Sequence, residues 1–177
     1  MKKYLLGIMF AAVANLSVHA YTLDQDFVNA TNSLYSAAGD AAYHSLPQSV
    51  TDLNEIYTTL VTAHADYNAE YAIPADQSSL RAELTGAETT IGSLSVDAQS
   101  YPEAKVSYYN NIGGMAGYYG AQPYIILENE IGSATGLSDL FLGNLINTLP
   151  PAPTPEPATI TLAGVGAVGL LVARRRK

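Results

Sequence analysis

The sequence of 177 residues contains no cysteine and no tryptophan. Without cysteine, disulfide bonds and thiolate metal sites are excluded, although the chain remains compatible with an oxidising compartment. The strict alternation of apolar and polar residues that marks a half-buried strand is also scarce. The chain therefore has to form its core mainly from helices.

Positive charge is nearly missing from the central part of the chain. Residues 21–149 contain two cations, Arg81 and Lys105, against fifteen acidic residues, which gives a net charge of −13. A surface of this sign repels the phosphates of nucleic acids, which argues against DNA or RNA binding. The electrostatic partners that such a surface attracts are cations, including divalent ions that bridge it to an acidic polysaccharide.

Residues 1–20 have the three regions of a secretory signal peptide. A pair of lysines precedes an apolar stretch over residues 5–13, and small residues occupy the positions that signal peptidase reads, ending at Ala20. We expect cleavage after Ala20, so that the exported body begins at Tyr21. The apolar stretch is well short of about 18 residues, which argues against an uncleaved anchor.

An uncharged apolar run over residues 158–173 predicts a second membrane segment. A helix of this length spans about 24 Å, somewhat less than the roughly 30 Å of a typical bilayer core. Cations at a membrane end favour the cytoplasmic side. Four of them follow the run: Arg174, Arg175, Arg176 and Lys177. We therefore expect a transmembrane helix with a basic cytoplasmic tail over residues 174–177, and a body outside the cytoplasm.

Residues 150–157 form a linker that contains five prolines. Prolines at this density enforce an extended polyproline conformation, which holds the body away from the bilayer and leaves the linker accessible to an enzyme. The order of Pro155, Glu156 and Pro157, an apolar helix and a basic cluster resembles the PEP-CTERM sorting signal of Gram-negative bacteria. The resemblance covers about the last 24 residues and does not extend to the body.

This resemblance implies a processing route. Exosortase, an integral-membrane cysteine transpeptidase-like enzyme, is implied to recognise Pro155, Glu156 and Pro157 and to remove the membrane helix. The resemblance also implies a host that produces exopolysaccharide and grows as a biofilm or floc. An ordinary C-terminal tail anchor behind a proline linker is the alternative interpretation of these residues.

Apolar residues at spacings of three and four predict a helical body over residues 21–149. The pattern indicates a first helix over residues 23–44 and a second over residues 47–73. Ser45 and Gln48 are placed to form a capping box at the start of the second helix.

The same spacing of apolar residues continues through the rest of the body. A third helix is predicted as far as Ala98. A fourth is expected to begin at Pro102, within another capping box, and glycines between residues 113 and 120 interrupt its second half. Apolar stretches follow at residues 124–131 and 137–149, and the first of them fits a strand as well as a helix. We predict an all-α antiparallel bundle of about four to six helices. A loosely packed or partly disordered helical body is the alternative.

Candidates for catalysis or metal binding are few. His64 falls on the core-facing stripe of the second helix, where a hydrogen-bonded and partly buried histidine is the expected state. Neither His64 nor His44 has the spacing of H-E-x-x-H, and no G-x-S-x-G or EF-hand loop is present. Close acidic pairs are common in so acidic a chain: Asp24 with Asp26, Asp66 with Glu70, and Glu128 with Glu130. We expect no catalytic residue, no metal site and no cofactor.

Tyrosine is enriched, with thirteen residues in the chain. The ring is large and apolar while the hydroxyl stays hydrated, so most tyrosines should lie at the boundary of the core. Two pairs, Tyr108 with Tyr109 and Tyr118 with Tyr119, flank a glycine-rich stretch. We hypothesise that these four make a flat platform for extracellular polysaccharide.

The sequence therefore predicts an exported, non-enzymatic protein that exosortase processes for the cell surface or an extracellular matrix. Its expected partners are signal peptidase, exosortase, the membrane through residues 158–173, and polysaccharide. A carbohydrate-binding or calcium-dependent adhesion module is the first alternative. A glycan-active enzyme is the second, and it requires a cleft with convergent carboxylates of shifted pKa.

Overall fold

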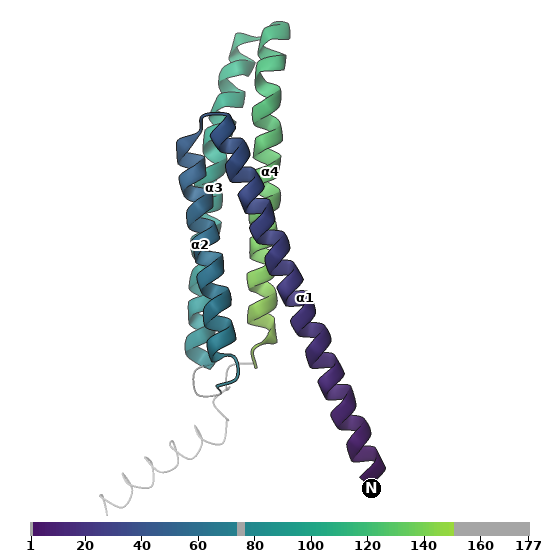
Figure 1. Ribbon diagram of the computed structural model, residues 1–177. Coiled ribbons are helices and arrows are strands. Elements are labelled where there is room, and N and C mark those ends of the chain that lie inside the picture. The colour runs from purple at the N-terminus through teal and green to yellow at the C-terminus, as the bar shows by residue number, and fades with distance from the viewer. Residues whose placement is uncertain (1, 74–76, 151–177) are drawn as a thin grey trace, which may run out of the picture.

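The computed structural model describes residues 2–73 and 77–150, with side chains from Thr22 onward. It contains four helices and, within these residues, no strand: α1 (Lys2–Tyr43), α2 (Pro47–Glu70), α3 (Gln77–Ile112) and α4 (Gly114–Thr148). Successive helices run in opposite directions and pack side by side (Figure 1). The predicted all-α antiparallel bundle is confirmed.

The core lies between the four helices and consists mainly of leucine and isoleucine. The apolar stripe expected on α3 is the buried one, since Leu80, Leu84, Ile91 and Ala98 are at most 1% exposed. The largest fully buried side chains come from every helix: Leu34, Leu53, Ile56, Leu60, Leu80, Leu84, Ile91, Leu127, Ile131, Phe141, Leu142 and Leu145. This packing, more than helix propensity, stabilises helices of this kind.

The turn between α1 and α2 differs from the expected capping box. Ser45 has a φ of 56°, and its N–H donates to Ala42 O at 3.0 Å, while Leu46 N–H donates to Ala41 O at 2.9 Å. These are the two bonds of a Schellman motif, which satisfies the last carbonyls of α1. Leu46 precedes α2 without a side-chain cap, and Gln48 bonds to a later residue. The predicted capping box is therefore wrong.

Helix α3 continues through Pro102, so the predicted start of a new helix there is also wrong. A proline inside a helix lacks the N–H that would bond to the carbonyl four residues earlier, which here is Ala98. Ser49 Oγ of α2 donates to Ala98 O at 3.0 Å, and Ser49 is fully buried. A hydrogen bond from the neighbouring helix thus replaces the one that Pro102 cannot make.

The two apolar stretches at residues 124–131 and 137–149 belong together, because α4 runs through both of them. The strand interpretation of the first stretch is therefore wrong. The turn before α4 is made by Gly113 and Gly114, whose φ values of 70° and 61° favour glycine. The later glycines of this region lie inside α4 and do not end it.

The predicted export signals fall largely outside this description. Residues 2–20 form the N-terminal part of α1, and cleavage after Ala20 stays a prediction. The motif Pro155–Pro157, the membrane helix over residues 158–173 and the basic tail over residues 174–177 lie outside the described residues. In residues 2–73 and 77–150, no helix is long and apolar enough to span a bilayer.

The bundle has two different ends (Figure 1). At one end, which we call the base, α4 ends and α1 continues toward the N-terminus. At the other end, α3 and α4 extend past the α1–α2 turn as a helical hairpin. The His44 ring in this turn lies 5.5 Å from the Tyr124 ring, and Ser49, near the start of α2, bonds to Ala98 O, so the hairpin beyond the turn lies between Ala98 of α3 and Tyr124 of α4. We call residues 101–123 the distal tip.

Candidate functional site

The base is where the chain leaves the bundle toward the C-terminal tail. Leu149 follows α4 in an extended conformation and is 4% exposed. Arg81 Nη2, from α3, donates to Leu149 O and to Pro150 O, each at 2.9 Å. The Tyr67 hydroxyl of α2 is hydrogen-bonded to Thr148 Oγ1 at 2.7 Å. Arg81 thus contacts the two residues at which the tail begins, whereas Tyr67 contacts the last residue of α4.

The base also brings together the start of the predicted mature chain and the end of α4. Asn144 Nδ2 donates to Asp26 Oδ2 at 3.1 Å. The groove around this bond has a volume of about 330 Å³ and is lined by Thr22, Leu23, Asp26, Asn144, Asn147 and Thr148. Because the mature chain is predicted to begin at Tyr21, next to Thr22, both ends of the body meet at the base.

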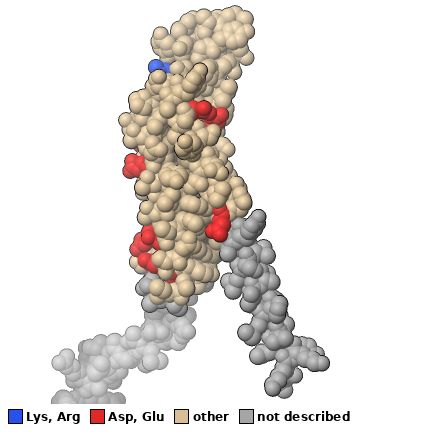
Figure 2. Space-filling model, viewed as in Figure 1, with Lys and Arg blue, Asp and Glu red and all other residues tan. Residues whose placement is uncertain are grey.

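The distal tip differs from the rest of the body in charge and polarity. Glu103 and Lys105 are its only charged residues, so its net charge is zero. On the face shown in Figure 2, the acidic side chains lie below the tip. The tip exposes several large side chains: Tyr101, Tyr108, Ile112, Met115, Tyr118 and Tyr119. An exposed apolar and aromatic patch of this kind commonly marks an interaction surface.

The four tyrosines of the predicted platform have different environments. Tyr108, Tyr118 and Tyr119 are 61%, 59% and 64% exposed. Tyr109 is partly buried, and its ring stacks on Tyr124 at 5.8 Å. Within each neighbouring pair the rings lie edge to face, with interplanar angles of 77° and 76°. The structure therefore offers three exposed rings and one packed ring, and polysaccharide binding by them stays a prediction.

Two glycines let Tyr109 lie against α4. A Cβ at Gly117 would overlap the main-chain oxygen of Tyr109, and a Cβ at Gly120 would overlap its ring. The distal tip buries only three residues, Pro102, Gly117 and Ala121. The close approach of Tyr109 to these glycines is therefore one of the few packing contacts between the two helices of the tip.

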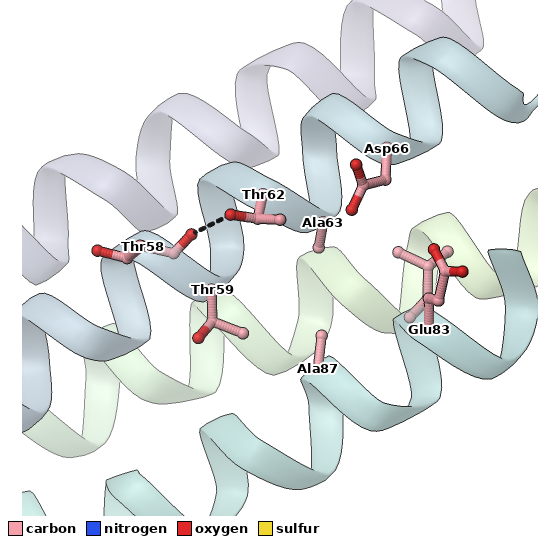
Figure 3. Close-up of a pocket in the computed structure, with 8 residues that line it drawn as sticks. Thr58, Thr59, Thr62, Ala63, Asp66, Glu83 and Ala87 are labelled. Carbon is pink, nitrogen blue, oxygen red and sulfur yellow. Dashed lines mark hydrogen bonds between the residues drawn. The ribbon is translucent and has the colours of Figure 1, made fainter.

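A second groove lies between α2 and α3, with a volume of about 250 Å³. It is lined by Thr58, Thr59, Thr62, Ala63, Asp66, Glu83, Leu84 and Ala87. Figure 3 shows Ala63 and Ala87 between the helices, with Asp66 and Glu83 toward one end. Thr62 Oγ1 donates to Thr58 O of its own helix at 3.0 Å. The groove thus has a floor of small side chains and two carboxyl groups at one end.

Two carboxyl pairs join α4 to its neighbours. A hydrogen bond with the Asp40 carboxyl of α1, together with burial and the Asp40 charge, raises the pKa of Glu130. Burial and the charge of Glu88 on α3 raise the pKa of Asp139. Glu130 Oε2 and Asp139 Oδ1 are buried and have no hydrogen-bond partner among the described residues. The members of each pair are far apart in the chain, so no sequence pattern indicated them.

His64 lies where the sequence predicts, partly buried on the core side of α2. Its ring centroid is 4.1 Å from that of Phe27 and 5.6 Å from that of Phe141. Its Nε2 atom is 3.1 Å from Asn68 Nδ2 and 3.7 Å from Asp24 Oδ1. Burial lowers the pKa of His64, and Asp24 opposes this change. His64 is therefore part of an aromatic cluster.

No metal centre forms from the side chains of residues 22–73 and 77–150. No three histidine, aspartate or glutamate side chains in these ranges lie close enough together to hold an ion. Of the acidic pairs noted in the sequence, Asp24 faces His64 and Asp26 faces Asn144. The structure thus places these two neighbours in separate contacts.

Comparison with known families identifies the tail. Residues 153–177 match the model of the PEP-CTERM protein-sorting motif. The chain carries a PEP-CTERM sorting signal. The resemblance seen in Pro155, Glu156 and Pro157 is thereby confirmed, and the signal implies exosortase as the processing partner and targeting to the cell surface of a Gram-negative bacterium. No curated protein and no solved structure matches the chain.

Proposed function

We propose that this PEP-CTERM protein is a non-catalytic component of the cell surface or of an exopolysaccharide-containing biofilm matrix. The observation that carries the proposal is the sorting motif at residues 153–177. The fold supports it, because the tail leaves the bundle at the base while the distal tip lies at the opposite end (Figure 1). With the base toward the membrane, the tip points outward.

Export begins, in this proposal, with signal peptidase cleavage after Ala20. Residues 158–173 then hold the body at the outer face of the inner membrane, with the basic residues 174–177 in the cytoplasm, until exosortase acts. In the folded body, the start of the predicted mature chain and the end of α4 line the same groove, so both can face the membrane together. The meeting of Thr22 and Thr148 at the base supports that arrangement.

The sorting step is tested by replacing Glu156 with alanine. We expect the variant to accumulate as full-length protein in the membrane fraction, because the carboxylate between the two prolines is the polar group that exosortase is expected to recognise. Membrane fractionation and immunoblotting measure the ratio of full-length to processed protein. Glu103→Ala, which removes an exposed acid of the distal tip, is the control and should be processed normally. Unchanged release of Glu156→Ala would refute the proposed route.

The positions of the carboxyl groups support a non-catalytic role. General acid–base chemistry on a glycan needs carboxyls of shifted pKa that converge in a cleft. The two carboxyls with raised pKa, Glu130 and Asp139, line neither of the two grooves. Glu130 faces α1 and Asp139 faces α3 instead, so each carboxyl lies in a contact between helices.

Polysaccharide binding by the distal tip is a second candidate function. The exposure of Tyr108, Tyr118 and Tyr119 on a tip without net charge favours it, because aromatic rings stack on sugar faces and the tip does not repel an acidic chain. In a calcium-dependent form of this binding, ions would bridge the acidic body to the polysaccharide.

A triple replacement of Tyr108, Tyr118 and Tyr119 by alanine tests the tip. Tyr109 is kept, because it packs against α4 within the hairpin. We expect affinity for the host's own polysaccharide to fall at least about tenfold, since each lost ring contact is worth about 0.5–1.5 kcal/mol. Sedimentation or calorimetric binding with and without EDTA measures the affinity. The matched control replaces three exposed aromatic or apolar residues of the lower body, Tyr35, Tyr57 and Val96. Equal affinity in both variants would exclude the tip as the binding surface.

A further inference from the structure

The contact between Arg81 and the start of the linker points to a role in sorting. We propose that Arg81 is a positioning residue, which holds the start of the linker so that Pro155–Pro157 stays within a short reach of the folded bundle. The inference rests on the proposed function, because it requires exosortase to act on this motif.

The geometry of the contact is specific for the main chain of the linker. Arg81 Nη2 lies 2.9 Å from Leu149 O and 2.9 Å from Pro150 O. The last carbonyls of a helix lack donors within the helix, and arginine is a suitable partner for them. Pro150 has no N–H with which to continue a hydrogen-bonded turn. A side-chain donor is therefore the means by which this end of the chain is held.

The part of α3 that carries Arg81 is packed firmly into the core. Arg81 lies between Leu80 and Leu84, which are 0% and 1% exposed. Thr148 is the last residue of α4, and Leu149 packs into the core at 4% exposure, so both are held by the bundle itself. Pro150 is the first residue beyond them, and among the described side chains the guanidinium of Arg81 is the one that donates to its carbonyl.

The reach from this contact to the sorting motif is short. Five residue steps separate Pro150 from Pro155, and they span at most about 18 Å when fully extended. A defined starting point reduces the number of arrangements among which the enzyme must select, and so raises the fraction in which the motif is placed for cleavage. Leu149 stays packed in the core without Arg81, so the replacement frees the backbone from Pro150 onward and should slow processing about tenfold.

Processing of the full-length chain in its host tests this role. We compare the wild type with Arg81→Ala, Arg81→Lys and Tyr67→Phe, following conversion of full-length to processed protein after a pulse label. Arg81→Ala should be processed about tenfold more slowly, and Arg81→Lys at an intermediate rate, because an ammonium group can still donate to one or both carbonyls. Tyr67→Phe is the matched control, since it removes a hydrogen bond at the same base without touching the carbonyls of Leu149 and Pro150. It should be processed at the wild-type rate.

A direct readout of the linker separates positioning from stability. The chain has no cysteine, so Ala152→Cys provides a unique attachment point for a spin label in the full-length protein in detergent. Label mobility should increase in the Arg81→Ala background and stay unchanged in the Tyr67→Phe background. Thermal unfolding of the same samples shows whether the two variants are equally stable.

The outcomes distinguish this inference from the function on which it rests. Normal processing of Glu156→Ala refutes the proposed function itself. Blocked Glu156→Ala together with wild-type processing or wild-type label mobility in Arg81→Ala refutes the role of Arg81. Equal slowing in Arg81→Ala and Tyr67→Phe, in proportion to their loss of stability, also refutes it, because any weakening of the base would then suffice.

Discussion

Replacing Gly117 with alanine should weaken the distal tip, although alanine is the better helix former. A Cβ at this position would overlap the main-chain carbonyl oxygen of Tyr109, and a backbone atom cannot turn aside as a side chain can. The two helices would have to separate, and overpacking of this kind costs about 1–3 kcal/mol. Because the distal tip buries few side chains, we expect the loss as local opening of residues 101–123.

Trypsin measures this opening, since Lys105 is the only lysine or arginine in the distal tip. Cleavage after Lys105 should become about five- to a hundredfold faster in Gly117→Ala, in line with the larger open population. Gly136→Ala is the control in the same helix, because a Cβ there meets nothing within 4 Å. That replacement should stabilise α4 by up to about 1 kcal/mol. Equal cleavage of both variants would show that Gly117 is not needed for the approach of the two helices.

The helices of the lower bundle could be predicted because their apolar spacing is local information. In α3, the residues expected on one face, such as Leu80, Leu84 and Ile91, are the ones that the structure buries. In α2, Tyr57 and Ile56 both fit an apolar stripe of this spacing, but Tyr57 is 43% exposed while Ile56 is fully buried. A spacing of three and four does not determine which of two neighbouring residues is buried, because that depends on the position of the facing helix.

The helix boundaries could not be predicted where a distant side chain changes the local rule. Pro102 normally ends or kinks a helix, yet the donor that compensates for it, Ser49, lies in another helix. Similarly, Ser45 resembles an N-cap in sequence but takes the left-handed position that closes α1. For Pro102 the missing information was the distant donor, whereas for Ser45 the local sequence fits the start of α2 as well as the end of α1.

In the candidate site, too, some features could be predicted from the sequence and others could not. The sorting signal is a linear motif, so it can be recognised in the sequence, and the family comparison matches residues 153–177, which contain Pro155, Glu156 and Pro157. The contact of Arg81 with Leu149 and Pro150 joins residues that no local pattern connects. The carboxyl pairs of α4 are of the same kind. A motif that an enzyme recognises as an extended segment can be found from the sequence, whereas contacts between helices can be found only once the fold is known.

Neutralising Glu130 and Asp139 together should stabilise the bundle at neutral pH and leave its stability at acidic pH unchanged. The folded state raises the pKa of both carboxyls, so it favours their protonated forms. Their contribution to the free energy of unfolding is therefore fully present below the unfolded pKa values, near 4, and is lost as the pH rises through the raised values. Glu130→Gln with Asp139→Asn removes this loss.

His64 acts in the opposite direction and must be separated from this effect. Burial lowers its pKa, so its contribution is present above about pH 6.5 and is lost as the pH falls through the lowered value. In the wild type, the two effects partly cancel between pH 4 and pH 7. In the double variant only the His64 contribution remains, and stability should rise toward neutral pH.

Chemical denaturation at a series of pH values tests the expectation. Both pairs are partly exposed, so solvent screening limits the expected gain at pH 7 to about 1–2 kcal/mol for the two replacements together. The control is Glu103→Gln with Asp97→Asn, which removes the same formal charge from exposed positions. If this control gains as much at pH 7 as Glu130→Gln with Asp139→Asn, the gain comes from the lower net charge of an acidic chain. A gain confined to the Glu130 and Asp139 variant would instead locate the pH dependence at the contacts of α4 with α1 and α3, where buried carboxyl oxygens lack donors.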